Sequence, residues 1–204
     1  MRAIVYVDGF NLYYGALKAT PYRWLDLEAL CTRLLPRDEI SLIRYFTARV
    51  TARPSDPDQP QRQQTYLRAL RTSAWLSIHL GEFRTRRVRM ARAQVPHHTV
   101  QVLKTEEKGS DVKLASYLLL DAFQGRCEVA VVISNDSDLK EPIRLAKNDL
   151  GVSVGVINPH PPEHRSRDLQ ATFFKQIRQG ALRASQFPLV LNDATGEIHK
   201  PASW

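Results

Sequence analysis

The stretch Val129–Leu139 constrains the fold more than any other part of this chain. It begins with the apolar run Val129-Ala-Val-Val-Ile133, which is rich in β-branched residues, and continues at once as Ser-Asn-Asp-Ser-Asp. Such a run is typical of a strand buried on both faces, as in a parallel sheet covered by helices. Ligands bind at the carboxyl edge of sheets of this kind. Asp136 and Asp138 are therefore predicted to lie at a functional edge.

Two further segments place carboxylates in similar positions. Ala3–Val7 is a second short apolar run and ends in Asp8, while Asp111 opens a segment with strong helical periodicity. We therefore expect Asp8, Asp111, Asp136 and Asp138 to converge. Carboxylate oxygens suit Mg²⁺ or Mn²⁺, and without a cation these groups would repel one another.

The alternative interpretation is that each aspartate caps a helix. An N-cap Asp accepts hydrogen bonds from the first turn of the helix that follows it. Capping explains any one of these residues taken alone. It does not require two aspartates one residue apart, so the metal site is favoured for the four together.

Three motifs in chain order resemble those of the NYN domain: Tyr6-Val-Asp-Gly-Phe-Asn-Leu12, Lys108-Gly-Ser-Asp-Val-Lys-Leu114 and Ile133-Ser-Asn-Asp-Ser-Asp-Leu139. That family belongs to the PIN-like nuclease superfamily and includes LabA-like proteins. The resemblance covers residues 4 to about 157. It implies a compact three-layer α/β sandwich of Rossmann-type topology with a Mg²⁺- or Mn²⁺-dependent ribonuclease site.

The resemblance also assigns roles by position. Asp8, Asp111, Asp136 and Asp138 match the acidic residues, and Asn11 matches the polar neighbour of the first motif. Asn135 stands where many relatives have glycine. Two roles are open for this asparagine: it crowds the site, or its amide orients a ligand.

Composition limits the class of protein. The chain has 204 residues, 43% of them hydrophobic, which is enough for one well-buried core. No apolar run approaches the roughly 18 residues of a membrane span, and the N-terminus begins directly with a strand rather than a signal peptide. We therefore expect no membrane partner and a cytoplasmic location. Cys31 and Cys127 have no metal-type spacing and are expected to be reduced core thiols.

The net charge of +8 favours a polyanionic partner. Between Glu82 and Glu106 the chain has no acidic residue. The pattern predicts a basic arm at about 84–104 that returns as a hairpin at Thr99–Leu103. Its basic residues are Arg84, Arg86, Arg87, Arg89, Arg92 and Lys104.

Single-stranded RNA is the favoured partner of this arm, because guanidinium groups bind phosphates and stack on unpaired bases. Lys113, in the helical segment that follows, is predicted to contact a further phosphate. The alternative is a solvated loop without a ligand.

The sequence predicts an α/β fold of three layers around a mostly parallel sheet. Residues 1–185 are expected to form the NYN-like domain, with Val152–Ile157 as its last parallel strand. Residues 186–204 form a C-terminal tail with a candidate hairpin at Asp193–Gly196. Two positions of this tail stay open: it packs on the domain, or it packs on a second copy in a homodimer.

The favoured function is a metal-dependent endoribonuclease. Asp8, Asp111, Asp136 and Asp138 would hold Mg²⁺ or Mn²⁺ directly or through water, with Asp136 or Asp138 accepting a proton from the attacking water and Asn11 orienting a ligand or the substrate. Hydrolysis by water needs no 2′-hydroxyl, so DNA stays open as a substrate.

Two other functions compete with this one. The alternative is a non-catalytic RNA-binding or regulatory scaffold with a metal-binding acidic pocket. A phosphatase with Asp8 as nucleophile is disfavoured, because Phe10 stands where such an enzyme needs a second acid.

Overall fold

The computed structural model describes residues 1–204 and contains a seven-stranded sheet in the order β4-β3-β2-β1-β5-β6-β7. Neighbouring strands are parallel except for the antiparallel pair β3 and β4. This arrangement confirms the predicted α/β fold. The strands are β1 (Arg2–Asp8), β2 (Glu39–Ala48), β3 (Leu76–Ala91), β4 (Thr99–Lys108), β5 (Val129–Ile133), β6 (Ser153–Asn158) and β7 (Phe173–Gln176).

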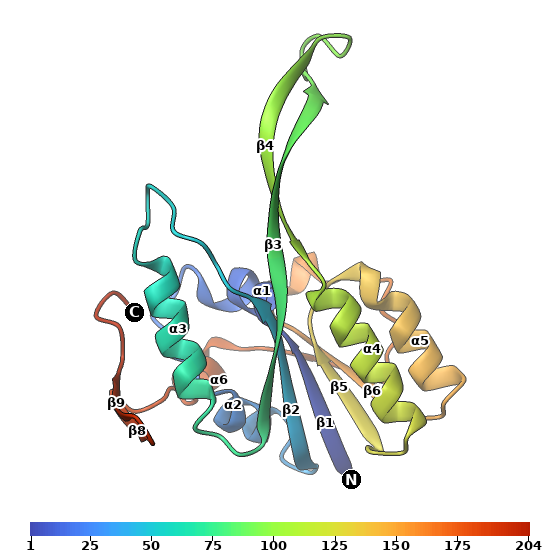
Figure 1. Ribbon diagram of the computed structural model, residues 1–204. Helices are drawn as coiled ribbons and strands as arrows, with labels where there is room; N and C mark the ends of the chain where they lie inside the picture. Colours follow the sequence, from blue (N-terminus) through green and yellow to red (C-terminus); the bar gives the residue numbers. More distant parts are fainter.

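Helices cover both faces of the sheet. Figure 1 shows α4 and α5 on one side and α1, α2, α3 and α6 on the other. None of them combines the length and the apolar character needed to cross a bilayer. The helical segments are α1 (Gly9–Leu12), η1 (Tyr13–Leu17), α2 (Leu27–Leu34), α3 (Gln59–Leu70), α4 (Ser110–Phe123), η2 (Ser137–Leu139), α5 (Lys140–Asn148), η3 (Pro162–His164) and α6 (Gln179–Arg183).

Alternation along the central strands builds two hydrophobic cores. In β1, Ala3, Val5 and Val7 belong to the core beneath α2 and α3, whereas Ile4 and Tyr6 belong to the core beneath α4 and α5. Successive side chains of a strand point to opposite faces, so a strand between two helical layers is apolar throughout. The same alternation continues in β5.

The prediction that Val152–Ile157 forms the last parallel strand was wrong. β7 pairs in parallel with β6 and extends the sheet by one strand. It has only four residues, Phe-Phe-Lys-Gln, and its position depends on the Phe173 ring lying over Gly155. A short polar edge strand carries little periodicity, and a contact with a distant glycine leaves no trace in the local sequence.

The C-terminal tail packs on the domain. Its two strands, β8 (Val190–Asp193) and β9 (Gly196–His199), form a separate antiparallel pair. Ile198 is buried in the core beneath α3, and the Trp204 ring lies 5.7 Å from that of Tyr66.

The strands β3 and β4 leave the body of the domain as a long two-stranded arm. β3 pairs with β2 up to Gly81, and from Glu82 onward it pairs with β4 instead, out to Ala91 opposite Thr99. Figure 1 shows the arm rising clear of both helical layers from the carboxyl edge of the sheet.

Candidate metal centre

Strand register brings Asp8 and Asp136 to one edge of the sheet. Val7 of β1 is paired with Ile133 of β5, so the two strands end at the same level. Asp8 is the last residue of β1, and Asp136 follows β5 by three positions. Asp111, in the first turn of α4, completes the group. One carboxylate oxygen from each of the three lies within 4.8 Å of the others.

Asp8 is the most enclosed member of this acidic trio, with 6% of its surface exposed. The Asn11 N–H donates to its Oδ1 (3.0 Å) and the Ser134 hydroxyl donates to its Oδ2 (2.9 Å). The Ser134 oxygen in turn accepts from the Asp136 N–H (3.1 Å). Ser134 therefore fixes two members of the trio at once.

Capping and clustering occur together. Asp8 caps α1, and Asp136 caps η2 by accepting from the Asp138 N–H (2.9 Å). Asp111 is no cap, because Gly109 occupies that position of α4 with a φ of 98°. A carboxylate has about four acceptor sites. The capping interpretation is thus right for two residues, and their carboxylates still have lone pairs free for a cation.

Asp138 lies outside the trio. It is exposed, and its backbone rather than its carboxylate contacts Asp136. Its charge still acts on the site, as one of the causes that raise the pKa of Asp111.

The two asparagines organise the loops around the trio. The Asn11 side-chain oxygen accepts from the Asn135 N–H (2.9 Å). The Asn135 amide donates to the His164 carbonyl (2.8 Å) and accepts from the Ser166 N–H (2.7 Å). Asn135 therefore fastens the loop that follows β6, and Asn11 holds the backbone leading into Asp136.

Burial is the largest cause of the pKa shifts of Asp8 and Asp111. It raises the pKa of Asp8 to about 6, against hydrogen bonds from Asn11 and Ser134 and with smaller additions from the charges of Asp111 and Asp136. Burial also raises the pKa of Asp111, followed by the charges of Asp136 and Glu107. The folded protein therefore resists ionisation of Asp8 and Asp111.

Glu107 and Ser134 are site residues that the sequence analysis missed. Glu107 accepts from the Ser110 N–H (3.1 Å) and hydroxyl (2.7 Å) and so holds the start of α4 beside the trio. Its position three residues before Ser110 follows no capping rule. Ser134 was visible as the first polar residue after β5, but its bond to Asp8 spans 126 positions.

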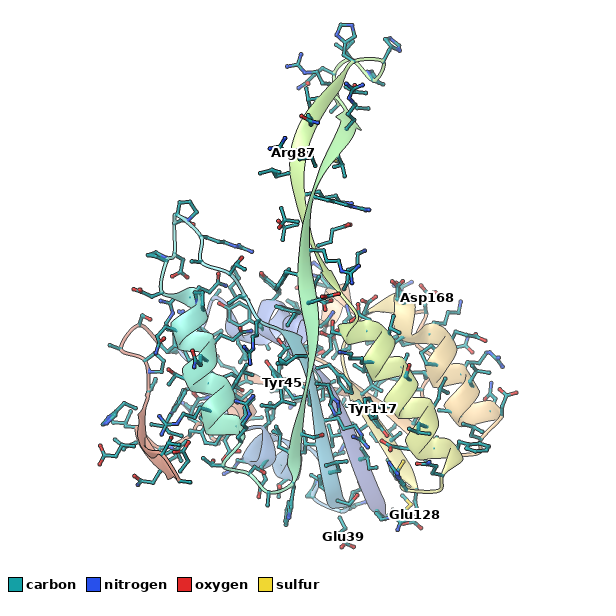
Figure 2. The ribbon with its side chains drawn as sticks, viewed as in Figure 1. Glu39, Tyr45, Arg87, Tyr117, Glu128 and Asp168 are labelled. Carbon is teal, nitrogen blue, oxygen red and sulfur yellow. The ribbon has the colours of Figure 1, made fainter.

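The arm divides its basic residues into two groups. Arg84 pairs with Glu82, and both Arg86 (3.2 Å) and Lys104 (2.6 Å) pair with Glu106. Arg87, Arg89 and Arg92 make no ion pair. Figure 2 shows Arg87 well out along the arm. Lys113 donates to the Leu80 carbonyl (2.5 Å) at the root of the arm.

One side of the arm leads back to the acidic trio. Residues directly opposite in an antiparallel pair point to the same side, as do alternate residues along each strand. Phe83 is opposite Glu107 and Arg87 is opposite Leu103. The side that carries Arg87 and Arg89 therefore begins at Glu107, next to Asp111.

The NYN domain model matches residues 2–177. The chain belongs to the NYN domain family. It is 30% identical to 6-hydroxy-3-succinoylpyridine 3-monooxygenase HspA of Pseudomonas putida (strain DSM 28022 / S16), over 100% of this chain and 75% of that protein. A protein of unknown function from Vibrio parahaemolyticus RIMD 2210633 has the same fold, with a TM-score of 0.58 and 16% identity over 87% of this chain and 93% of that one.

NYN domains are generally nucleases, so family membership indicates a nuclease-type function. The acidic trio of this NYN domain is compatible with a metal site. The match of the NYN domain model confirms the predicted resemblance to the family.

The raised pKa of Asp8 predicts how stability depends on pH in chelator. The Asp8 carboxyl loses its proton near pH 3.8 in the unfolded chain and near pH 6 in the folded protein. Protonated Asp8 therefore stabilises the fold fully below pH 4, and this contribution is lost as pH rises through 6. Between pH 4 and 7 the wild type should lose roughly 2–3 kcal/mol of unfolding free energy relative to Asp8→Asn. Urea unfolding of both proteins measures this. Parallel pH profiles would show that Asp8 titrates normally.

Proposed function

We propose that this NYN domain is a metal-dependent endoribonuclease that hydrolyses phosphodiester bonds in single-stranded RNA. The observation that supports this most directly is the meeting of Asp8, Asp111 and Asp136 within 4.8 Å at the carboxyl edge of the sheet. In a family of nucleases, such a cluster at such an edge is where a phosphodiester would be cleaved.

The donor set of the trio fits Mg²⁺ or Mn²⁺. Both ions take carboxylate oxygens and are commonly held by few protein groups plus substrate phosphates. Two ligands on opposite sides of one octahedral ion are roughly 4.2 Å apart, close to the span of the trio. A bound divalent cation would supply Lewis acidity toward the phosphodiester and its attacking water.

We assign Asp138 to accept the proton of that water. It is exposed and lies two residues from Asp136, and none of its oxygens belongs to the trio. A positioned general base contributes about 10²–10⁴-fold to rate. We therefore assign Asp8, Asp111 and Asp136 to the metal and Asp138 to proton transfer, with Asn11 positioning the Asp136 loop.

The basic arm would bind the strand that enters this site. Arg87, Arg89 and Arg92 have free guanidinium groups for phosphates, and one side of the arm ends beside Asp111. Hydrolysis of this kind makes no use of the 2′-hydroxyl, so the same site would accept a DNA strand. Free arginines suit unpaired, flexible strands, so a single strand is preferred over a duplex.

Replacing Asp136 tests catalysis. Asp136→Asn removes one ligand charge at constant size, so Mn²⁺-dependent cleavage of single-stranded RNA should fall by at least about 10²-fold while RNA binding persists. Gel analysis of labelled RNA measures cleavage, and calorimetry measures binding. Asp149→Asn, on an exposed pair with Arg144, is the matched control and should keep full activity.

Two outcomes contradict the assignment. A wild type that binds RNA but cleaves none of a varied set with Mg²⁺ or Mn²⁺ would favour the non-catalytic scaffold. Full activity of Asp136→Asn would remove that residue from the site.

Salt dependence tests the arm. Arg87→Ala/Arg89→Ala should weaken RNA binding and flatten the slope of log affinity against log salt by about 0.7 for each phosphate that the arm no longer neutralises. Fluorescence anisotropy at several salt concentrations measures both quantities. The control Arg144→Ala/Lys147→Ala removes the same charge from α5 and should leave the slope unchanged. If the slope flattens equally in both variants, the effect is caused by net charge and not by contacts of the arm with phosphates.

A second candidate function is oxygenation of a small heteroaromatic molecule, because the Pseudomonas putida relative is a monooxygenase. The observation that favours it is a cavity beside Gly9 that is lined by aromatic side chains. Oxygen uptake with 6-hydroxy-3-succinoylpyridine and a reduced nicotinamide donor would support this function. Mn²⁺-dependent RNA cleavage without oxygen uptake would favour the nuclease.

A further inference from the structure

A cavity of about 110 Å³ lies on the side of the sheet that carries α1 and α3, and no residue of the acidic trio lines it. It lies among the η1 turn, the loop before α3 and the root of the arm. Gly9 forms part of its wall and directly follows Asp8. A side chain at Gly9 would collide with the Tyr45 hydroxyl (2.7 Å), which also lines the cavity.

Seven aromatic side chains line this cavity. Phe10 and Phe83 meet edge to face with ring centroids 5.7 Å apart, and Phe83 belongs to the root of the arm. Tyr13 and Tyr14 form a second edge-to-face pair at 5.3 Å. Stacked or edge-on rings give favourable contacts to any flat ring that enters.

An unusual helical turn supplies the two tyrosines. Tyr13–Leu17 is a π-helix, a rare conformation that occurs frequently at functional sites. The His160 ring lies against Gly15 within it, where a β-carbon would be only 2.7 Å from the ring. The loop after β6 therefore braces the turn from outside, and the same loop is fastened to Asn135 at the trio.

Guanidinium groups lie at the rim of the cavity. Arg62 is occupied by an ion pair with Asp56. Arg53 is exposed and its side chain makes no hydrogen bond or ion pair, while Arg23 uses only its Nε, in a bond to the Thr20 carbonyl (3.2 Å). The rim thus keeps positive donors free for an anion.

We infer that this cavity binds one planar heteroaromatic ring that carries an anionic group. An enclosed cavity of about 150 Å³ holds one benzene ring. The cavity of about 110 Å³ beside Gly9 is therefore suited to a single ring and too small for a folded peptide. The aromatic walls would contact the ring and Arg53 and Arg23 would bind the anion.

Two sources supply such a ligand. In the nuclease proposed above, it is an unstacked base with its phosphate, held beside the phosphodiester to be cleaved, and this part rests on the proposed function. The second source is a free heteroaromatic acid, such as a pyridine ring that carries a succinoyl chain.

Binding in chelator tests the inference without any catalysis. The four 5′-mononucleotides, 6-hydroxynicotinate and ribose 5-phosphate are titrated by calorimetry into the wild type. We expect either the nucleotides or 6-hydroxynicotinate to bind with millimolar affinity or better, and ribose 5-phosphate, which has no aromatic ring, to bind at least about fivefold more weakly. Nucleotide binding would identify a base of the strand as the source, and 6-hydroxynicotinate alone would identify a free acid.

The position of the ligand is tested by the tryptophan indole signals in ¹H–¹⁵N spectra. Trp204 lines the cavity, whereas Trp75 lies at the amino end of β3. The Trp204 signal should shift on titration and the Trp75 signal should not.

Variants complete the test. Tyr14→Ala and Arg53→Ala change exposed residues and should each weaken binding by roughly 5- to 100-fold. Phe123→Ala, an exposed aromatic residue at the end of α4, is the matched control and should bind normally. In the nuclease, Tyr14→Ala should change the positions at which Mn²⁺-dependent cleavage cuts the RNA.

Three results would overturn the inference. They are no binding of either ring-bearing class at about 10 mM, equal binding of ribose 5-phosphate, and an unmoved Trp204 signal. Failure of the nuclease looks different, because Asp136→Asn and the wild type would then be equally inactive on RNA while ring binding in chelator persisted.

Discussion

Three carboxylates crowded into one partly buried edge of the sheet set the main constraint on this protein. Asp8, Asp111 and Asp136 come from two strand ends and a helix start, and their oxygens meet within 4.8 Å. Burial does most to raise the pKa of Asp8, and repulsion from the charges of Asp111 and Asp136 adds to it. The fold tolerates the arrangement because the parallel register of β1 and β5 and the Ser134 hydroxyl hold Asp8 and Asp136 in place. A divalent cation would convert that repulsion into binding energy.

The third carboxylate depends on how α4 is anchored to the sheet. Asp121 of α4 is fully buried and accepts from Arg44 of β2 (2.7 and 2.9 Å) and from Tyr6 of β1 (2.9 Å). Although burial opposes it, the bonds from Arg44 and Tyr6 hold the pKa of Asp121 below its ordinary value. Removing one partner of such a buried pair costs about 3–5 kcal/mol. This network sets the position of α4 and so brings Asp111 to the edge where β1 and β5 end.

The sequence predicts those parts of the molecule whose cause is local. Val129–Ile133 is a buried strand as its composition requires, and three of the four aspartates singled out by their place after apolar runs do meet. Asp138 also follows the β5 run, but in the η2 turn only its backbone N–H contacts Asp136, as part of the cap. Its carboxylate lies outside the trio. Glu107, β7 and the aromatic cavity depend on contacts between distant segments, and no local pattern marks them.

Manganese titration in solution tests whether the acidic trio binds a divalent cation. Calorimetry of the chelator-treated wild type should show saturable Mn²⁺ binding that Asp8→Asn and Asp136→Asn each weaken by more than about tenfold, because each removes a charge from the acidic trio. Asp138→Asn should bind Mn²⁺ like the wild type, since its carboxylate lies outside the trio. If the wild type binds no Mn²⁺, or if both trio variants bind it as tightly as the wild type, the trio is not a cation site.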